Sequence, residues 1–170
     1  MANAGKEFEK QFKESVTDDM YFLRLHDSAI GFGNVEGGKF AVKSPYDCIL
    51  AKAPIFYALE LKSKAINRLV YKSTGTVDIK PHQIKELRKA ASKGLRAGFV
   101  FNFRKENHTY FVSIAAFDYI TGFQMTKKNS ITEKDVLEAM QERFDVVLIP
   151  QKLKKVNYKY DLSVLFKEEA

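Results

Sequence analysis

The stretch Ser44-Pro-Tyr-Asp-Cys-Ile-Leu-Ala-Lys-Ala-Pro-Ile-Phe-Tyr-Ala-Leu-Glu-Leu-Lys-Ser-Lys64 decides how the rest of the chain can fold. Residues 47–50 and 55–62 are short, mostly apolar runs on either side of a proline-containing turn, so they predict two consecutive strands. The second run suits a buried strand, yet it ends in Glu60 and Lys62, which buried strands usually avoid. Because side chains alternate along a strand, Glu60 and Lys62 project from the same face.

A second carboxylate, Asp47, precedes Glu60 by thirteen positions. Antiparallel pairing of the two strands would bring it beside Glu60 and Lys62. Two carboxylates and a lysine at one strand end can hold Mg²⁺ and activate a water for phosphodiester hydrolysis. An ordinary Glu–Lys pair at a frayed strand end, with Asp47 unrelated to it, explains the same residues equally well, because the pattern is short and degenerate. Spacing alone leaves both interpretations open.

Length and composition favour one folded domain over residues 1–170, with an apolar content of 45%. No apolar run approaches the roughly 18 residues of a membrane span, so we expect no membrane partner. The single Cys48 excludes an intramolecular disulfide and a cysteine-based zinc site. We expect an intracellular, cytoplasmic protein.

The positive charge is concentrated directly after the strand pair. The net charge is +7, but residues 61–110 hold twelve Lys or Arg against three Asp or Glu, and the rest of the chain holds sixteen against eighteen. Such a block favours a polyanion lying across the neighbouring strand end, and nucleic acid is favoured over acidic lipid. A merely solvated basic surface is the other interpretation.

Before the strand pair, residues 4–16 predict a helix whose apolar side is formed by Phe8 and Phe12. Glu9 lies beside that side and can lean into a cleft, or it can pair with Lys13 one turn later. A first strand is expected at 20–26.

A glycine-bearing flexible excursion follows at about 28–44. Its Gly33 and Lys39 have the spacing of a phosphate-binding loop, but Phe40 replaces the required Ser or Thr and Pro45 interrupts the expected helix, so a nucleotide site is rejected. A mobile hairpin that carries Lys39 and Lys43 is expected instead.

After the strand pair, residues 63–80 have no clean period and predict a mobile basic loop. The expected elements that follow are a helix at 81–93 with Gln83 facing the sheet, strands at 97–103 and 109–114, helices at 115–121 and 131–143, a closing strand at 146–149, and a basic tail at 152–159 before an apolar segment, 161–166, that packs back. This order predicts an α/β fold: one domain, with a mixed central sheet flanked by helices.

Taken together, separate motifs resemble the RecU-type Holliday junction resolvases of the PD-(D/E)xK nuclease superfamily, and the shortness of one segment, described below, suits a phage-borne relative. The matching residues are Asn3-x-Gly5-x-x-x-Glu9, Asp47 with Glu60-Leu61-Lys62, Pro81-His82-Gln83, and the pair Gly98-Phe-Val-Phe-Asn-Phe103 and Thr109-Tyr-Phe-Val112. The segment from Asp27 to Tyr46, which forms a stalk in that family, is short here. The resemblance implies a restriction-endonuclease-like core.

The resemblance also implies roles for individual residues. Asp47 and Glu60, with the Leu61 carbonyl, would bind Mg²⁺ or Mn²⁺, and Lys62 would orient or help deprotonate the attacking water. Glu9 would approach the metal directly or through a water, and Gln83 would position the scissile phosphate or a metal-bound water. The DNA contacts implied are Lys39, Lys43, Lys64, Arg68, Lys72 and His82.

The expected function is therefore a metal-dependent endonuclease that resolves four-way DNA junctions by paired symmetric nicks during recombination and repair. Two nicks require two active sites, which implies a homodimer, and a recombinase is a candidate partner. Two alternatives stay open: a nuclease of the same superfamily without junction specificity, and a branched-DNA-binding protein that does not cut.

Overall fold

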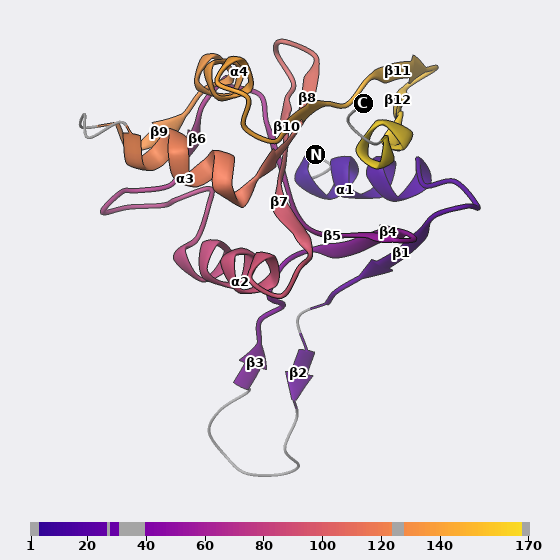
Figure 1. Ribbon diagram of the computed structural model, residues 1–170, viewed down its shortest axis with the longest axis horizontal. Helices are drawn as coiled ribbons and strands as arrows, with labels where there is room; N and C mark the ends of the chain where they lie inside the picture. Colours follow the sequence, from indigo (N-terminus) through magenta and orange to yellow (C-terminus); the bar gives the residue numbers. More distant parts are fainter. Residues whose placement is uncertain (1–3, 27, 31–39, 124–127, 168–170) are drawn as a thin grey trace.

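The computed structural model describes residues 4–26, 28–30, 40–123 and 128–167, and within them the chain forms one central sheet with helices on both faces (Figure 1). The elements, in chain order, are α1 (Ala4–Glu14), β1 (Tyr21–Arg24), β2 (Ser28–Ile30), β3 (Phe40–Val42), β4 (Cys48–Lys52), β5 (Ile55–Lys64), β6 (Leu69–Val70), α2 (Pro81–Ala91), β7 (Arg96–Phe103), β8 (His108–Ser113), α3 (Ile114–Phe123), β9 (Ser130–Ile131), α4 (Glu133–Gln141), β10 (Val146–Leu148), β11 (Gln151–Lys154), β12 (Asn157–Tyr160) and the 3₁₀ helix η1 (Leu162–Phe166).

The central sheet has six strands in the order β1-β4-β5-β7-β8-β10. Only β5 and β7 pair in parallel, and α2 makes the crossover between them, whereas the other neighbours pair antiparallel. The predicted mixed α/β sheet is therefore confirmed. The two strands expected in the opening stretch are β4 and β5, and the predicted helix before them is α1.

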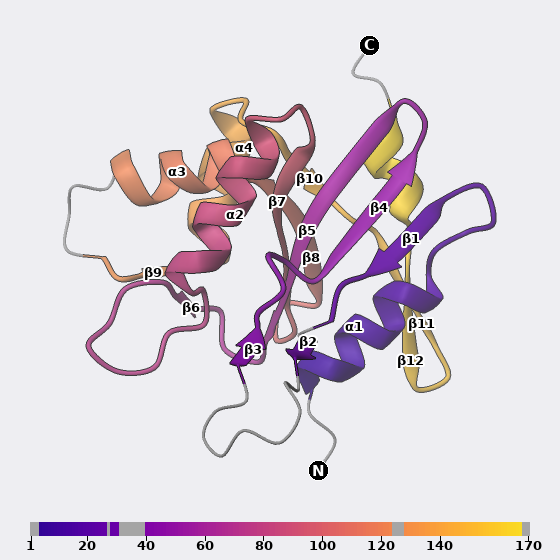
Figure 2. The same ribbon diagram turned by 90° about the horizontal axis from the view of Figure 1, so that it is seen from below.

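Each face of the sheet has its own apolar core, because β5 alternates between them. Ala58 faces a core built with α2, α3 and α4, whereas Tyr57 and Leu59 face a second core with α1, β12 and η1. Figure 2 shows α2 on one side of β5 and α1 on the other. Both cores meet at β5, so its end is held from both sides.

A glycine is required where β7 approaches β8. A Cβ on Gly98 would lie closer than contact distance to the Val112 carbonyl oxygen and against the Phe111 ring. Gly98 is paired with Ser113 in the register of the two strands. The glycine therefore allows the close contact between β7 and β8.

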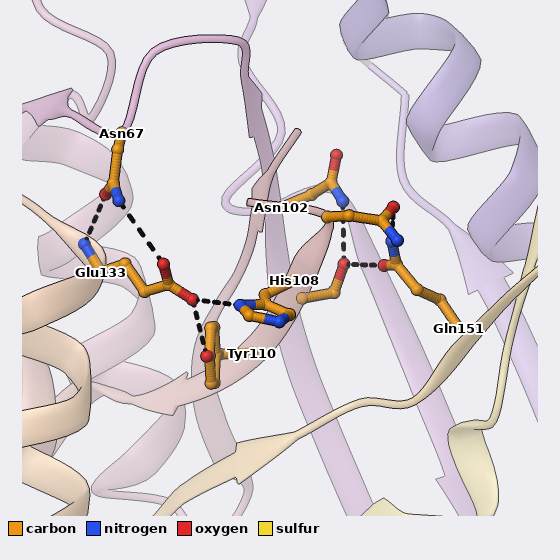
Figure 3. A network of polar contacts seen from close by, with 8 residues as sticks. Asn67, Asn102, His108, Tyr110, Glu133 and Gln151 are labelled. Atoms are coloured by element: carbon orange, nitrogen blue, oxygen red, sulfur yellow. Dashed lines mark hydrogen bonds and ion pairs between the residues drawn. The ribbon is translucent and has the colours of Figure 1, made fainter. Parts of the chain in front are cut away.

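Residues 63–80 are not the loop without regular structure that the sequence predicted. Leu69 and Ile79 are buried in the core on the α2 side, and β6 pairs antiparallel with β9. The Asn67 amide oxygen accepts from the Glu133 backbone N–H at 2.7 Å, so the segment is fastened to the start of α4 (Figure 3). Isolated apolar residues without a period anchor this segment, which is why pattern analysis missed it.

The tail at 152–159 is also more ordered than predicted, because it forms the antiparallel hairpin β11–β12. The prediction that residues 161–166 pack back is confirmed: they form η1, whose Leu162 and Leu165 are buried against the α1 side. The excursion at 28–44 has paired ends, β2 and β3, which project from the body in Figure 1, while its residues 31–39, including Lys39, lie outside the described part. None of the described helices is long and apolar enough to cross a membrane.

Candidate active site at the end of β5

Asp47 and Glu60 lie directly opposite each other at the edge where β4 and β5 begin to separate. Cys48 pairs with Leu59, and the Asp47 N–H donates to the Leu59 carbonyl at 3.1 Å. The Asp47 carboxylate then accepts the Leu61 N–H at 2.8 Å, so a side chain takes a hydrogen bond from the strand backbone. The antiparallel arrangement inferred from the spacing of the two carboxylates is therefore what the chain adopts.

Glu60 is buried, with 2% of its surface exposed, and its carboxylate is held by two side chains. The Lys62 ammonium lies 2.8 Å from Glu60 Oε1, and the Gln83 amide N–H donates to the same oxygen. Gln83 is itself oriented by the Lys80 backbone N–H, which donates to its amide oxygen at 2.8 Å. The start of α2 thus brings Gln83 onto the end of β5, as predicted.

Glu9 reaches the same region from α1, but its partner is not the Lys13 considered in the sequence. Its carboxylate forms an ion pair with Arg24 at the end of β1. Both side chains are partly buried, at 34% and 19% exposure for Arg24 and Glu9. Glu9 therefore belongs to the group around Glu60 and Asp47, but Arg24 balances its charge.

One cavity of about 310 Å³ collects these side chains. All five residues predicted to be catalytic line it, together with Leu61, and they come from α1, the start of β4, β5 and the start of α2. Its other lining residues are Arg24, Leu25, His26, Lys43, Ser44, Tyr46, Lys80 and His82. The cavity therefore combines a carboxylate floor with several positive groups.

The two carboxylates Asp47 and Glu60 are unfavourable when ionised. Burial raises the pKa of Glu60 from 4.5 to about 7, in spite of the opposing effect of Lys62, and the neighbouring Asp47 raises it further. Burial also raises the pKa of Asp47, although the Leu61 N–H opposes the rise and Glu9 adds to it. A positive charge placed between the carboxylates would relieve this repulsion.

The donor set fits a hard divalent cation. Mg²⁺ in proteins often binds one or two carboxylates and keeps several water ligands, and Asp47 with Glu60 supplies that number. Among the described residues, no three His, Cys, Asp or Glu side chains are close enough together to hold a metal ion. An all-protein cage of the kind typical of structural zinc or calcium is therefore not formed by these residues, whereas a water-rich magnesium site is compatible with them.

The residues predicted to contact DNA divide into two groups. Lys43 and His82 line the cavity. Lys64, Arg68 and Lys72 do not line it: Lys64 forms an ion pair with Asp78 at 2.6 Å, and Arg68 donates to the Ser130 hydroxyl at 3.0 Å. Part of the basic block is thus engaged within the protein rather than gathered at the cavity.

Sequence analysis missed several residues of the cavity, above all Arg24 and Lys80. Arg24 alternates with apolar residues in β1, but nothing in the sequence indicates that β1 lies next to β4 and faces α1. Lys80 directly precedes Pro81 and occupies the N-cap of α2, a position from which it can be expected beside Gln83. Its position directly before the predicted Pro81-His82-Gln83 element is the feature of the sequence that could have identified it as a residue of the site.

No known family model matches the sequence, and no curated protein matches it. Among solved structures, a similar chain is that of Hjc, a Holliday junction resolvase from the archaeal hyperthermophile Archaeoglobus fulgidus. The two chains are 14% identical with a TM-score of 0.48, over 76% of this chain and 88% of the resolvase. A similarity of this extent carries no functional conclusion, so the function proposed below is argued from the side chains of this chain.

Proposed function

We propose that this protein is a metal-dependent endonuclease that cuts branched DNA, with four-way junctions as its substrate. The observation that carries the proposal is the convergence of Asp47, Glu60, Lys62 and Gln83 in one polar cavity beside Glu9. These residue types, brought from separate elements to the end of a buried strand, are the ones that phosphodiester hydrolysis needs.

Each residue has a role that its position supports. Asp47 and Glu60, with the Leu61 carbonyl, would hold Mg²⁺ or Mn²⁺, which supplies Lewis-acid activation of the phosphodiester and of the attacking water. Lys62, held at 2.8 Å from Glu60, would orient that water and offset the negative charge that develops on the phosphate. Gln83 would hold the scissile phosphate in place.

Positive groups at the cavity would receive the rest of the backbone. Lys43, Lys80 and His82 line the cavity beside the carboxylates, so a phosphate that approaches the metal ligands meets cationic or hydrogen-bonding groups on the same wall. Such contacts fix the position of DNA and carry little sequence information. This arrangement supports recognition of DNA without a sequence preference.

The preference for a branched substrate is supported by the paired strands β2 and β3, called here the hairpin β2–β3, which project from the body (Figure 1). Residues on both sides of the hairpin, His26 and Lys43, line the cavity. Duplex arms that diverge around a projection suit this shape better than one straight duplex. Paired nicks in a four-way junction then require two copies of the site, and we propose a two-fold symmetric homodimer.

The test uses a labelled immobile four-way junction and a linear duplex of the same sequence, each with Mg²⁺ and with EDTA. We expect paired, symmetric, metal-dependent nicks in the junction alone. Asp47→Asn combined with Glu60→Gln should abolish cleavage and leave junction binding in Ca²⁺ intact. A matched control, Glu14→Gln combined with Glu138→Gln, removes two exposed carboxylates away from the cavity and should cut normally.

Three other outcomes would change the proposal. Equal cutting of both substrates would retain the site but indicate a nuclease without junction specificity. Tight junction binding without cutting in Mg²⁺ or Mn²⁺ would indicate a branched-DNA-binding protein. Cleavage by the Asp47 and Glu60 double variant would mean that the site itself is assigned wrongly.

A further inference from the structure

The hairpin β11–β12 is strongly basic. Residues 151–160 contain four lysines and no Asp or Glu. Some lysines elsewhere in the chain are paired, for example Lys52 with Asp19 at 2.6 Å and Lys128 with Asp135 at 2.9 Å. Within the part of the chain that the structure describes, the ammonium groups of Lys152, Lys154, Lys155 and Lys159 form no ion pair. The charge of the hairpin is therefore not used inside the described fold.

Three of these lysines share one face of the hairpin. Lys152 is directly opposite Lys159, and Lys154, two residues after Lys152, lies on the same face. Like charges directly opposite each other in an antiparallel pair are destabilising. A surface with such a pair is suited to a partner of opposite charge, because the partner's negative groups would offset the repulsion between the lysines.

The other face of the hairpin is anchored to the body. Tyr160 is buried, its ring lies 5.5 Å from that of Phe8, and its backbone N–H donates to the Ser15 hydroxyl at 2.9 Å. At the base of the hairpin, Gln151 accepts from the Thr109 hydroxyl at 2.6 Å and donates to the Asn107 amide oxygen (Figure 3). The lysines are therefore presented on a supported ribbon and not on a free tail.

Hydroxyl groups lie beside the lysine face. A cavity of about 450 Å³ is lined by Lys152, Lys154 and Lys159 together with the side chains of Ser15, Thr17 and Ser163. The Asp161 carboxylate also lines it but accepts from the Ser163 N–H and hydroxyl, at 3.1 and 2.6 Å. The three hydroxyls already donate within the protein, to the Gln11 carbonyl and to the Asp19 and Asp161 carboxylates. The lysine amines are therefore the groups of this face that can bind phosphate oxygens along a nucleic-acid backbone.

The hairpin and the candidate active site lie on the two sides of α1. Glu9 lines the active-site cavity, whereas Glu7 and Gln11 line a separate cavity that also includes Val156 of the hairpin turn and Ser63, next to Lys62. Figure 2 shows the end of β5, the start of α1 and the turn of β11–β12 at the same end of the molecule.

A basic residue lies between the candidate active site and the hairpin. Arg104, in the turn between β7 and β8, is exposed and lines the same cavity as Val156 and Ser63. Lys6, in the first turn of α1, is also exposed. A duplex that leaves the active site across the start of α1 would therefore pass these two cations, beside Glu7, before it reaches the turn of the hairpin.

We propose that the lysine face of β11–β12 is a second DNA-binding surface, which contacts the phosphates of a duplex arm that extends from the candidate active site. The identity of that arm rests on the proposed junction substrate, whereas the DNA-binding character of the face rests on its own lysines and their unfavourable like-charge pair. These contacts add affinity and orientation without adding sequence preference.

The test replaces Lys152, Lys154 and Lys159 together by glutamine and measures the Kd for a labelled junction in Ca²⁺ at several salt concentrations. A phosphate contact contributes about 0.9 to the slope of log K against log salt, so the slope should become shallower by about 3 and the affinity should fall severalfold. The melting temperature should not fall, because the variant removes a repulsive pair. A matched control triple, Lys93→Gln, Lys134→Gln and Lys167→Gln, removes three exposed lysines from other parts of the surface and should keep the slope.

A second measurement locates the DNA directly. Cys48 is buried, with 1% of its surface exposed, so Val156→Cys at the hairpin turn introduces an accessible thiol for a photo-crosslinker. Val156 is 85% exposed, and its replacement leaves both cores unchanged. We expect crosslinks from position 156 to an arm of the junction, and none from Lys134→Cys on α4.

The two proposals fail in different ways. If the wild-type protein cuts no DNA but the glutamine triple still lowers affinity and slope, the proposed function is wrong and the binding surface stands. If the wild-type protein nicks junctions, but the triple variant keeps its salt dependence and position 156 gives no crosslink, the second surface is wrong and the nuclease stands. An equal loss in the control triple would also overturn the inference, because it would show a general charge effect.

Discussion

Replacing Glu60 by glutamine should abolish cleavage and at the same time stabilise the metal-free protein. The Glu60 carboxylate is 2% exposed and lies opposite Asp47, so its negative charge is unfavourable in the folded state without a cation. Glutamine has the same shape and keeps an amide oxygen that can accept from Gln83 and Lys62. The substitution therefore removes the charge and retains the packing.

The magnitude follows from the pKa of Glu60, which burial raises from 4.5 to about 7. One pKa unit corresponds to about 1.4 kcal/mol, so ionised Glu60 lowers the free energy of unfolding by about 3 kcal/mol relative to a neutral group. This value already includes the favourable effect of Lys62. For a chain of this length, 1 kcal/mol shifts the melting temperature by about 2–4 °C, so a rise of roughly 10 °C is expected.

The sign of the pH dependence is fixed by the same shift. As the pH rises from about 4.5 to 7, the unfolded chain releases the Glu60 proton first, while the folded chain still holds it. The unfolded state then binds fewer protons, and the stability of the wild-type protein falls across this window. Below it the two proteins should be equally stable at this position, and above it the difference should be constant.

Urea unfolding of both proteins in EDTA at a series of pH values between about 4 and 9 measures this difference. Glu138→Gln, which removes an exposed glutamate of α4, serves as the control and should follow the wild-type curve. Adding Mg²⁺ should stabilise the wild-type protein more than Glu60→Gln, because the cation binds the charged form. A Glu60→Gln variant that is equally or less stable at pH 8 in EDTA would refute the reasoning.

Three further outcomes follow from the geometry. Mg²⁺ or Mn²⁺ should raise the melting temperature of the wild-type protein but not that of Asp47→Asn, as measured by thermal unfolding with metal titration; an equal shift in both would place the metal elsewhere. Arg24→Gln should remove the ionic partner of Glu9 and tighten metal binding severalfold, because another uncompensated carboxylate then faces the site. If the metal concentration at half-saturation is the same in the variant and the wild-type protein, Glu9 lies too far from the metal to affect its binding. Gly98→Ala should destabilise the protein by more than about 3 kcal/mol, since the new methyl group meets the Val112 carbonyl oxygen, and a near-normal unfolding midpoint would contradict that contact.

The strands and the polar end of β5 could be predicted because their signals are local. Alternation in 55–62 determines which side chains share a face, and the separation between Asp47 and Glu60 fits a short antiparallel connection. Gln83 could be placed because the helical period from Leu87 determines its direction. In each case the residues that determine the geometry lie near one another in the sequence.

The parts that could not be predicted depend on contacts between distant segments. Leu69 and Ile79 have no period of their own, and they are buried because β6 meets β9, about sixty residues later in the chain. Arg24 reaches Glu9 only because β1 closes the sheet edge beneath α1. The pairing of Lys64 with Asp78 likewise reduces the free basic charge that composition alone indicated.

The sequence left open whether Glu60 and Lys62 are a frayed pair or part of a site, and their surroundings decide between the two. A frayed strand end would expose both side chains to solvent. Instead, β5 stays paired with β7 as far as Lys64, and Glu60 is buried. Lys62 does not compensate for this burial, because the pKa of Glu60 remains raised to about 7 with Lys62 in contact. Asp47 adds a second carboxylate where fold stability alone would favour an apolar or neutral residue. A buried pair of carboxylates with one insufficient lysine lacks a positive charge, and a divalent cation at this position is the simplest group that would supply it.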